Sequence, residues 1–383
     1  MDLLKDIIEI GVTDNNVDLF EGQYVVPEGM RYNSYLIADE KTAVLDTVDG
    51  HFTDEWLNNL EKALGGKTPD YLIVQHLEPD HSASITAFAD KYKSAVIVSS
   101  KAAFTMMKNY YGNEYEDRRL IVAEGASLSL GKHELKFVGA PMVHWPEVIM
   151  TYDATAGALF SADGFGKFGS TGSTDDWACE ARRYYFGIVG KFGAQVQAVL
   201  KKVADKTINA IYPLHGPVLK DNLGYYVGLY DKWSKYEAED KGVTIAYTSV
   251  YGHTKAAVEK LKDELESRGV TVAVHDLARG DMAEAVEDAF RYDRLVLATT
   301  TYNGDIFPFM RTFIDALTER NYQNRKIGFI ENGSWAPMAI KVMQPMFEKC
   351  KNVTFASTQV KIVAALSQSN LEQISALAEE LKN

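Results

Sequence analysis

Short apolar runs separated by turn residues characterise the chain up to about residue 240. The runs 24–26, 32–38 and 42–46 predict antiparallel strands, since Gly22, Gly29 and Asp39 interrupt them. Further strands are predicted at 71–74, 95–98, 120–122, 135–138, 148–152 and 158–161. Apolar residues at helical spacing predict helices over 53–64 and 83–92, the second capped by Ser82 or Ser84, and a helical region from 176 to 200.

A different pattern follows the charged stretch 231–241. Strands are predicted near 243–248, 270–275, 295–299, 326–331 and 353–360, with helices beginning near 254, 281, 307, 336 and 370. This alternation indicates a doubly wound parallel sheet that binds ligands at the carboxyl ends of its strands. We therefore expect an α/β protein of two domains, residues 1–240 and 241–383.

Composition narrows the class of protein. The 383 residues are 46% hydrophobic and 24% charged, which is typical of globular domains, and the net charge of -13 argues against a nucleic-acid partner. Cys179 and Cys350 are the only cysteines, so a disulfide framework or a thiolate iron-sulfur site is not expected. Charges interrupt residues 1–11, so these do not form a secretory signal, and no apolar run could span a membrane. We expect a cytoplasmic protein.

The strongest candidate site follows the predicted strand 71–74. The sequence Gln75-His76-Leu77-Glu78-Pro79-Asp80-His81 places four potential metal ligands within six residues. Pro79 prevents regular strand pairing and allows their side chains to converge. Imidazole and carboxylate together suit iron, manganese or zinc.

Three more candidates lie where predicted strands end: His144, Asp163 and His215. Taken singly, each histidine is more often structural than a ligand, and a strand-end aspartate usually caps a turn. Taken with the first four, they give four imidazoles and three carboxylates, which is enough for two metals that share one bridging carboxylate.

One local pattern suggests a different ligand. Gly164-Phe-Gly166-Lys-Phe-Gly169 spells a dinucleotide-binding fingerprint after an apparent strand. We do not expect a dinucleotide there, because the pattern lies within the series of metal ligands and because 170–176 is predicted to be a loop rather than a helix.

In the second half, three polar loops follow the first, third and fourth predicted strands, at 248–254, 299–304 and 331–336. The first opens a helix, so its backbone N–H groups and hydroxyls could cradle a phosphate, although a capped helix explains such a loop alone about as well. The candidate contacts are Thr248, Ser249, Val250, Tyr251, Gly252, His253, Thr254, Thr300, Thr301, Tyr302, Asn303, Gly304, Asn332, Gly333, Ser334 and Trp335.

The metal motifs support a specific resemblance. His-x-Glu-x-Asp-His at 76–81, His-Trp-Pro-Glu at 144–147, Leu-Phe-Ser-x-Asp-x-Phe-Gly at 159–166 and Pro-x-His-Gly at 213–216 resemble the metallo-β-lactamase-like domain of the flavodiiron proteins. Hydrolases of that superfamily carry histidine where this chain has Glu78, and a hard anionic oxygen favours iron over zinc. The resemblance implies an αββα sandwich in which His76, Glu78 and His144 bind one iron, Asp80, His81 and His215 bind the other, and Asp163 bridges them.

The second half resembles flavodoxin. Its first loop is similar to the phosphate loop Ser/Thr-x-Thr-Gly-x-Thr, with Tyr251 in place of the central threonine, and Thr300 stands where the ring loop commonly has proline. The resemblance implies bound FMN, on whose ring Trp335 could stack.

Together the resemblances imply a flavodiiron oxidoreductase that reduces dioxygen to water, nitric oxide to nitrous oxide, or both, with electrons delivered through FMN. They also imply a head-to-tail homodimer, or a tetramer built from it, and rubredoxin or a flavin reductase as electron donor. A zinc-dependent hydrolase fused to a flavodoxin-like domain, and a flavin electron carrier, are the alternatives. Substrate preference is expected to depend on Trp145, Tyr184, Tyr185 and the loop 22–32.

Overall fold

The computed structural model describes residues 3–383, so the first two positions of the N-terminal segment considered above lie outside it. The chain divides into two compact units, which meet between Asp231 and Lys232. The boundary predicted after residue 240 falls just after the first residue of strand β16 (Asp240–Tyr247), beyond the division between the two units. Within residues 3–383, no helix has the length and apolar character needed to cross a membrane.

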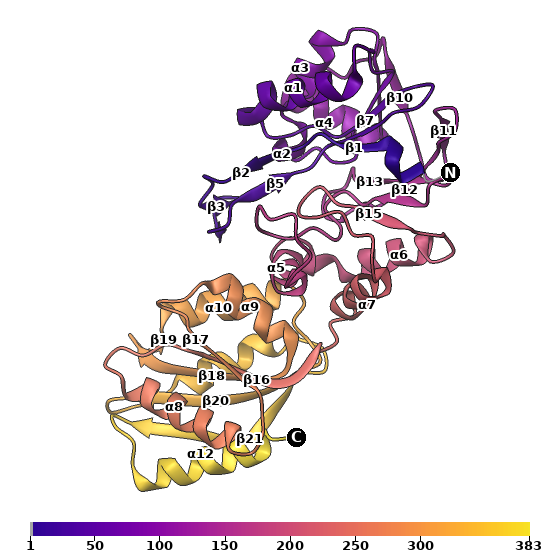
Figure 1. The fold of residues 1–383 in the computed structure, drawn as a ribbon. Coiled ribbons are helices and arrows are strands. Elements are labelled where there is room, and N and C mark those ends of the chain that lie inside the picture. The colour runs from indigo at the N-terminus through magenta and orange to yellow at the C-terminus, as the bar shows by residue number, and fades with distance from the viewer. Residues whose placement is uncertain (1–2) are drawn as a thin grey trace. The chain divides into compact units, whose positions relative to one another are not determined.

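The first unit is built on two sheets (Figure 1). One has the order β1 (Ile7–Glu9), β6 (Tyr35–Ile37), β7 (Ala43–Leu45), β8 (Tyr71–Ile73), β9 (Val96–Ser99) and β10 (Arg119–Ile121). The other has the order β11 (Ser127–Ser129), β12 (Glu134–Gly139), β13 (Ile149–Asp153), β14 (Ala158–Phe160) and β15 (Ala210–Tyr212). Two short ribbons pair β2 (Val12–Asp14) with β5 (Met30–Tyr32) and β3 (Leu19–Phe20) with β4 (Tyr24–Val25).

Apolar side chains join these sheets face to face. Tyr35 and Leu45 of the first sheet share one buried cluster with Phe137 and Phe160 of the second. The helices of this unit are η1 (Leu3–Asp6), η2 (Gly50–Phe52), α1 (Thr53–Leu64), α2 (Pro79–Ser82), α3 (Ile85–Lys91), α4 (Lys101–Tyr111), α5 (Trp177–Tyr184), η3 (Tyr185–Val189), η4 (Gly190–Phe192), α6 (Gly193–Val203) and α7 (Leu223–Ser234), whose last residues belong to the second unit. The predicted αββα sandwich is confirmed.

Some local predictions were wrong. The helix predicted over 83–92 is α3, Ile85–Lys91, and a separate short helix, α2, ends at Ser82 before it. Ser84 is the residue before α3, but its side chain does not cap the helix. Its hydroxyl instead lies 2.8 Å from the Thr53 hydroxyl. The helical region 176–200 contains a π-turn over 185–189 and a 3-10 turn over 190–192. The antiparallel strands predicted at 24–26, 32–38 and 42–46 are observed, since β4 pairs antiparallel with β3 and β6 pairs antiparallel with β7, while β7 also pairs parallel with β8.

The second unit is the predicted doubly wound sheet. Its parallel strands have the order β17 (Val272–Asp276), β16 (Asp240–Tyr247), β18 (Tyr292–Tyr302), β20 (Lys326–Gly333) and β21 (Thr354–Val363), and β19 (Asp305–Ile306) pairs back on β18. This order, 2-1-3-4-5, is that of flavodoxin-like folds. The helices are α8 (His253–Glu266), α9 (Met282–Arg291), α10 (Pro308–Glu319), α11 (Ala339–Met343), η5 (Gln344–Phe347) and α12 (Gln368–Glu380). The helix expected from residue 336 begins at Ala339.

Candidate functional site

The structure brings all seven predicted metal ligands of the first unit together in two adjoining groups. His76, Glu78, His144 and Asp163 form one group, and Asp80, His81 and His215 form the other, with the potential ligand atoms of each group within 4.8 Å of one another. The first sheet supplies the segment after β8, and the second sheet supplies the residues before β13, after β14 and after β15. The site therefore lies where strands of the two facing sheets end.

Asp163 lies between the two groups and is fully buried. Its Oδ2 is 3.0 Å from His144 Nε2 and 3.2 Å from His76 Nε2. Its Oδ1 is 3.1 Å from His81 Nε2 and 3.7 Å from His215 Nε2. One carboxylate oxygen thus faces each group, which is the arrangement that a bridging ligand requires.

The electrostatics of the site favour positive charge at its centre. Burial opposes the charge on Asp163, but His76 and His81 hold the pKa of this carboxyl well below its usual value. Burial likewise opposes protonation of His144, but the carboxylates of Asp163 and Glu78 raise its pKa to about 9. The carboxylates therefore retain protons on imidazoles that a metal cation could displace.

Several polar atoms of the site accept no hydrogen bond from residues 3–383, although they are buried. These include both carboxylate oxygens of Asp80 and Oδ1 of Asp163. Buried polar atoms are normally satisfied, so an absent partner needs a cause. A pair of bound metal ions would supply the missing partners, because the side chains here combine hard carboxylate oxygens with imidazoles, which such ions bind.

The sequence did not identify two residues that orient His76. Glu147 Oε1 accepts hydrogen bonds from His76 Nδ1 at 2.8 Å and from the Leu77 backbone at 2.9 Å. Asp46 Oδ1 accepts from the Gln75 backbone at 2.7 Å, and its Oδ2 accepts from the Gln75 side chain at 2.8 Å. Glu147 ends the His-Trp-Pro-Glu motif, so the motif contained a signal for it, whereas nothing in the sequence distinguished Asp46.

Gly166 of the dinucleotide-like pattern, together with Gly216, allows two loops to pack closely at the site. A Cβ on Gly166 would lie 3.4 Å from the Cβ of His215 and 3.0 Å from the carbonyl of Asp163. A Cβ on Gly216, whose φ is +77°, would lie 2.6 Å from Cγ of Lys167. Gly166 and Gly216 thus allow the Asp163 and His215 loops to pack against each other, so Gly166 of the pattern has a packing role in this site.

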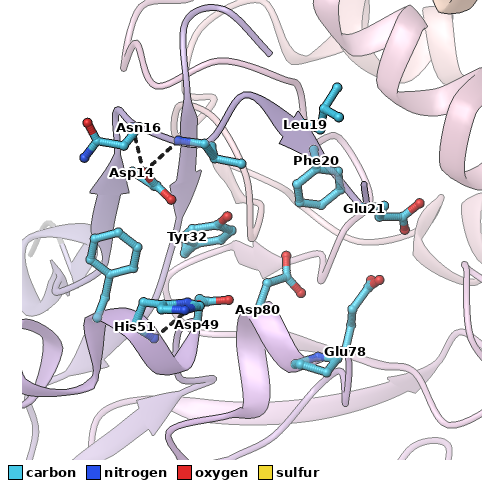
Figure 2. A pocket seen from close by; sticks show the side chains of 13 residues that line it. Asp14, Asn16, Leu19, Phe20, Glu21, Tyr32, Asp49, His51, Glu78 and Asp80 are labelled. Atoms are coloured by element: carbon cyan, nitrogen blue, oxygen red, sulfur yellow. Dashed lines mark hydrogen bonds and ion pairs between the residues drawn. The ribbon is translucent and has the colours of Figure 1, made fainter. Parts of the chain in front are cut away.

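A pocket of about 590 Å³ opens above the two groups (Figure 2). Glu78 and Asp80 form part of its floor, and Phe20, Glu21 and Tyr32 from the β2–β5 region lie over them. Tyr32 ends the predicted specificity loop 22–32. The pocket gives a small molecule access to a carboxylate of each group.

The other specificity candidates differ in their surroundings. The Tyr184 ring centroid lies 5.4 Å from that of His215, and burial together with the charge of Asp163 raises the pKa of this phenol well above its usual value. Trp145 lies 5.2 Å from the His76 ring. Tyr185 packs on Phe186 and Tyr230. Tyr184 and Trp145 therefore stay better candidates than Tyr185.

In the second unit, the three predicted loops surround a pocket of about 230 Å³. Ser249, Val250, Tyr251, His253, Thr254, Thr300, Asn332 and Ser334 line it, together with Ala364, which the sequence did not suggest. The remaining candidates do not line it: Thr248, Gly252, Thr301, Tyr302, Asn303, Gly304, Gly333 and Trp335. Thr248 is buried below the loop, with its hydroxyl 2.6 Å from that of Thr299.

The pocket has the features of a site for the phosphate of FMN, and two exposed aromatic residues on the same loops are available to its ring. It lies at the N-terminus of α8, where backbone N–H groups bind anions, and it contains hydroxyl donors. Gly252, with φ of +89°, has no atom within 4 Å of the position that a Cβ would take, so the chain can approach a ligand closely there. Tyr251 and Trp335 are 90% and 88% exposed and are available to stack on a flat ring.

Comparisons with known proteins match the two units to two different families. Residues 30–216 match the model of the ODP family beta lactamase, and residues 244–353 match a flavodoxin domain. A nitric oxide reductase of Moorella thermoacetica is 29% identical over 89% of this chain and 88% of that relative. A putative diflavin flavoprotein of Synechocystis is also 29% identical, over 91% of this chain but only 61% of its own length.

Solved structures show the same two-unit arrangement along the chain. The flavodiiron protein from Giardia intestinalis is 26% identical, and the similarity covers 98% of this chain and 95% of that one with a TM-score of 0.91. The match therefore includes both the unit with the seven clustered ligands and the unit with the phosphate-loop pocket.

Proposed function

We propose, because this chain belongs to the flavodiiron protein family, that it is an oxidoreductase that reduces dioxygen to water, nitric oxide to nitrous oxide, or both. The observation that carries the proposal is the convergence of all seven candidate ligands with Asp163 between their two groups. Carboxylates at Glu78 and Asp80 give both groups hard oxygen donors, which suits iron.

The ligand assignment is part of this proposal. His76, Glu78 and His144 would hold one iron, Asp80, His81 and His215 the other, and Asp163 both. When bound, the iron pair supplies positions for the substrate and the electrons that reduce it, while FMN supplies electrons to the pair. The loops 248–254, 299–304 and 331–336 would hold FMN.

The residues around the iron site would orient its ligands and keep the substrate pocket small. Glu147 holds Nδ1 of His76, and the Arg31 carbonyl accepts from Nδ1 of His215 at 2.8 Å, so Nε2 of both rings faces the cluster. Phe20 lies with its ring 5.3 Å from His215 and limits the space above it. Tyr184 keeps its phenol proton and is a neutral neighbour of the cluster.

We also propose a head-to-tail homodimer, or a tetramer of such dimers, in which the flavin of one subunit serves the irons of the other. Rubredoxin or a flavin reductase would donate the electrons. Sedimentation of the FMN-loaded protein would give the assembly state.

Metal and flavin analysis of anaerobically purified protein tests the function. We expect two irons and one FMN per chain, and consumption of dioxygen or nitric oxide when reduced rubredoxin is added. Stoichiometric zinc without gas consumption would favour the fused hydrolase. One FMN without bound metal would favour a simple electron carrier. Either of those results would overturn the proposal.

A further inference from the structure

A second pocket of the first unit, about 370 Å³ in volume, shares no lining residue with the pocket above the metal groups. It lies between the segment 26–28 after β4, the loop 167–176 and the start of α5. Val26 and Phe168 give it a buried apolar wall. Its volume is within the range of small-molecule sites, roughly 300–1,000 Å³.

Lys167 lines this pocket and is only 3% exposed. Its stem packs on Gly216, and its ammonium has no hydrogen bond or ion pair with any residue of the described chain, 3–383. Burial lowers the pKa of Lys167, and the charges of Glu180 and Glu28 oppose this effect without contacting the ammonium. Because the side chain is largely enclosed and its ammonium has no partner in the described chain, the ammonium is available to an anionic group that enters the pocket.

The rim of the pocket is negatively charged and would attract a cationic group. Glu28, Asp175 and Asp176 are exposed, and none of them forms an ion pair within residues 3–383, whereas Glu180 pairs with Arg183 at 2.9 Å. Three unpaired carboxylates would repel a simple anion that approached Lys167. A ligand that satisfies both regions must carry an anionic end for the lysine and a cationic end for the rim.

We propose that this pocket binds a free α-amino acid with an apolar side chain. The carboxylate of the ligand pairs with the Lys167 ammonium, its ammonium faces the carboxylates of Glu28 and Asp176, and its side chain packs on Val26 and Phe168. The site is separate from the proposed redox reaction, so its occupancy does not depend on iron or flavin.

Calorimetric titration of the full-length holoprotein with L-leucine tests the proposal. Two matched probes each lack one charged group of L-leucine: 4-methylpentanoate lacks the amine, and isoamylamine lacks the carboxylate. We expect saturable binding of one L-leucine per chain, and binding of each half-ligand that is weaker by about tenfold or more, since each loses one charged contact. Equal binding of 4-methylpentanoate, or no heat with L-leucine, would overturn the proposal.

Variants locate the site. Lys167→Met keeps most of the stem against Gly216 and should abolish L-leucine binding, whereas Lys101→Met, at an exposed position on α4, should leave it unchanged. Glu28→Gln changes only an exposed side chain, so it tests the site even if Lys167→Met does not fold, and it should weaken binding several-fold. Unchanged affinity in Glu28→Gln and in folded Lys167→Met would place the ligand elsewhere and refute the proposal.

Discussion

Glu147 and His76 are joined by a hydrogen bond of 2.8 Å between two fully buried side chains, 71 residues apart in sequence. The carboxylate accepts from Nδ1, so Nε2 of the ring is free to face Glu78 and Asp163, from which it lies 3.3 and 3.2 Å. The position of one proposed iron ligand therefore depends on a residue that does not itself reach the metal position.

We expect Glu147→Gln to lower iron affinity by about 10-fold or more, because partners of metal-bound histidines typically contribute about 10–100-fold. Competition with an iron chelator under anaerobic conditions measures the change, and FMN content should stay at the wild-type value. Glu55→Gln, at an exposed position of α1, is the control. Unaltered iron affinity in Glu147→Gln would show that the hydrogen bond does not support the site.

Asp163→Ala should remove paired iron and leave FMN bound. Asp163 is the residue whose two oxygens face the two groups, and the flavin loops belong to a different unit of the chain. Iron analysis and the flavin absorption spectrum give the two readouts on one sample. A variant that kept two irons per chain with normal gas consumption would contradict the bridging role.

The sequence revealed most of the site because its chemistry is concentrated at strand ends. Residues 76–81 are adjacent in sequence, and His144, Asp163 and His215 each follow or precede an apolar run, so the fold class alone brings them to one edge. The flavin loops were predictable for the same reason, since parallel strands end at one side of a sheet.

Contacts that depend on the path of the backbone could not be predicted in this way. Asp46, directly after β7, accepts a hydrogen bond from the backbone of Gln75, 29 residues later in the chain, and its sequence neighbours give no sign of this contact. The spacing of apolar side chains stays helical through residues 185–189, so the sequence pattern gives no sign of the π-turn there. The ammonium of Lys167 has no ion pair because the nearby carboxylates do not reach it, and this depends on how the loops pack rather than on the sequence pattern.

Gly216→Ala should destabilise the first unit by about 1–3 kcal/mol more than Gly125→Ala, as expected for overpacking. Both glycines have φ of +77°, so both substitutions cost the same backbone strain. Only Gly216 meets a neighbour, Cγ of Lys167 at 2.6 Å, whereas Gly125 has none within 4 Å. Chemical denaturation of the two variants gives the difference. Equal destabilisation would mean that the Lys167 stem moves aside freely.

Trp335→Ala should weaken FMN binding by several-fold and leave the stability of the flavin-free protein unchanged. The side chain is 88% exposed, so it contributes little to folding, and an aromatic stack is typically worth about 0.5–1.5 kcal/mol. Fluorescence titration of flavin-free protein measures the affinity. Trp335→Phe retains an aromatic ring and should keep most of the wild-type affinity for FMN. Affinity as low as that of Trp335→Ala would argue against stacking.

His133 gives the first unit a pH-dependent contribution to stability through ion pairs that include none of the predicted metal ligands. Its Nδ1 lies 2.5 Å from Oδ2 of Asp153, and its Nε2 lies 3.5 Å from Oδ2 of Asp6 in η1. Burial alone would lower the pKa of this imidazole, but the Asp153 carboxylate raises it above the usual value of 6.5. Because the folded pKa is the higher one, the stabilisation is complete below about pH 6.5 and is lost as pH rises through the folded value.

We therefore expect His133→Gln to lower the free energy of unfolding by about 1.5–3 kcal/mol near pH 6, the usual value of a hydrogen bond to a charged group, and by progressively less at alkaline pH. Denaturant titrations of wild type and variant across this pH range measure the difference in the free energy of unfolding. The metal-site histidines are present in both proteins, so their contribution to the pH dependence cancels in this difference. His51→Gln, whose side chain is 92% exposed, should show almost no difference at any pH. A difference for His133→Gln that stayed constant or grew with rising pH would mean that the imidazole is neutral in the folded protein and that Asp153 stabilises it only as a hydrogen-bond acceptor.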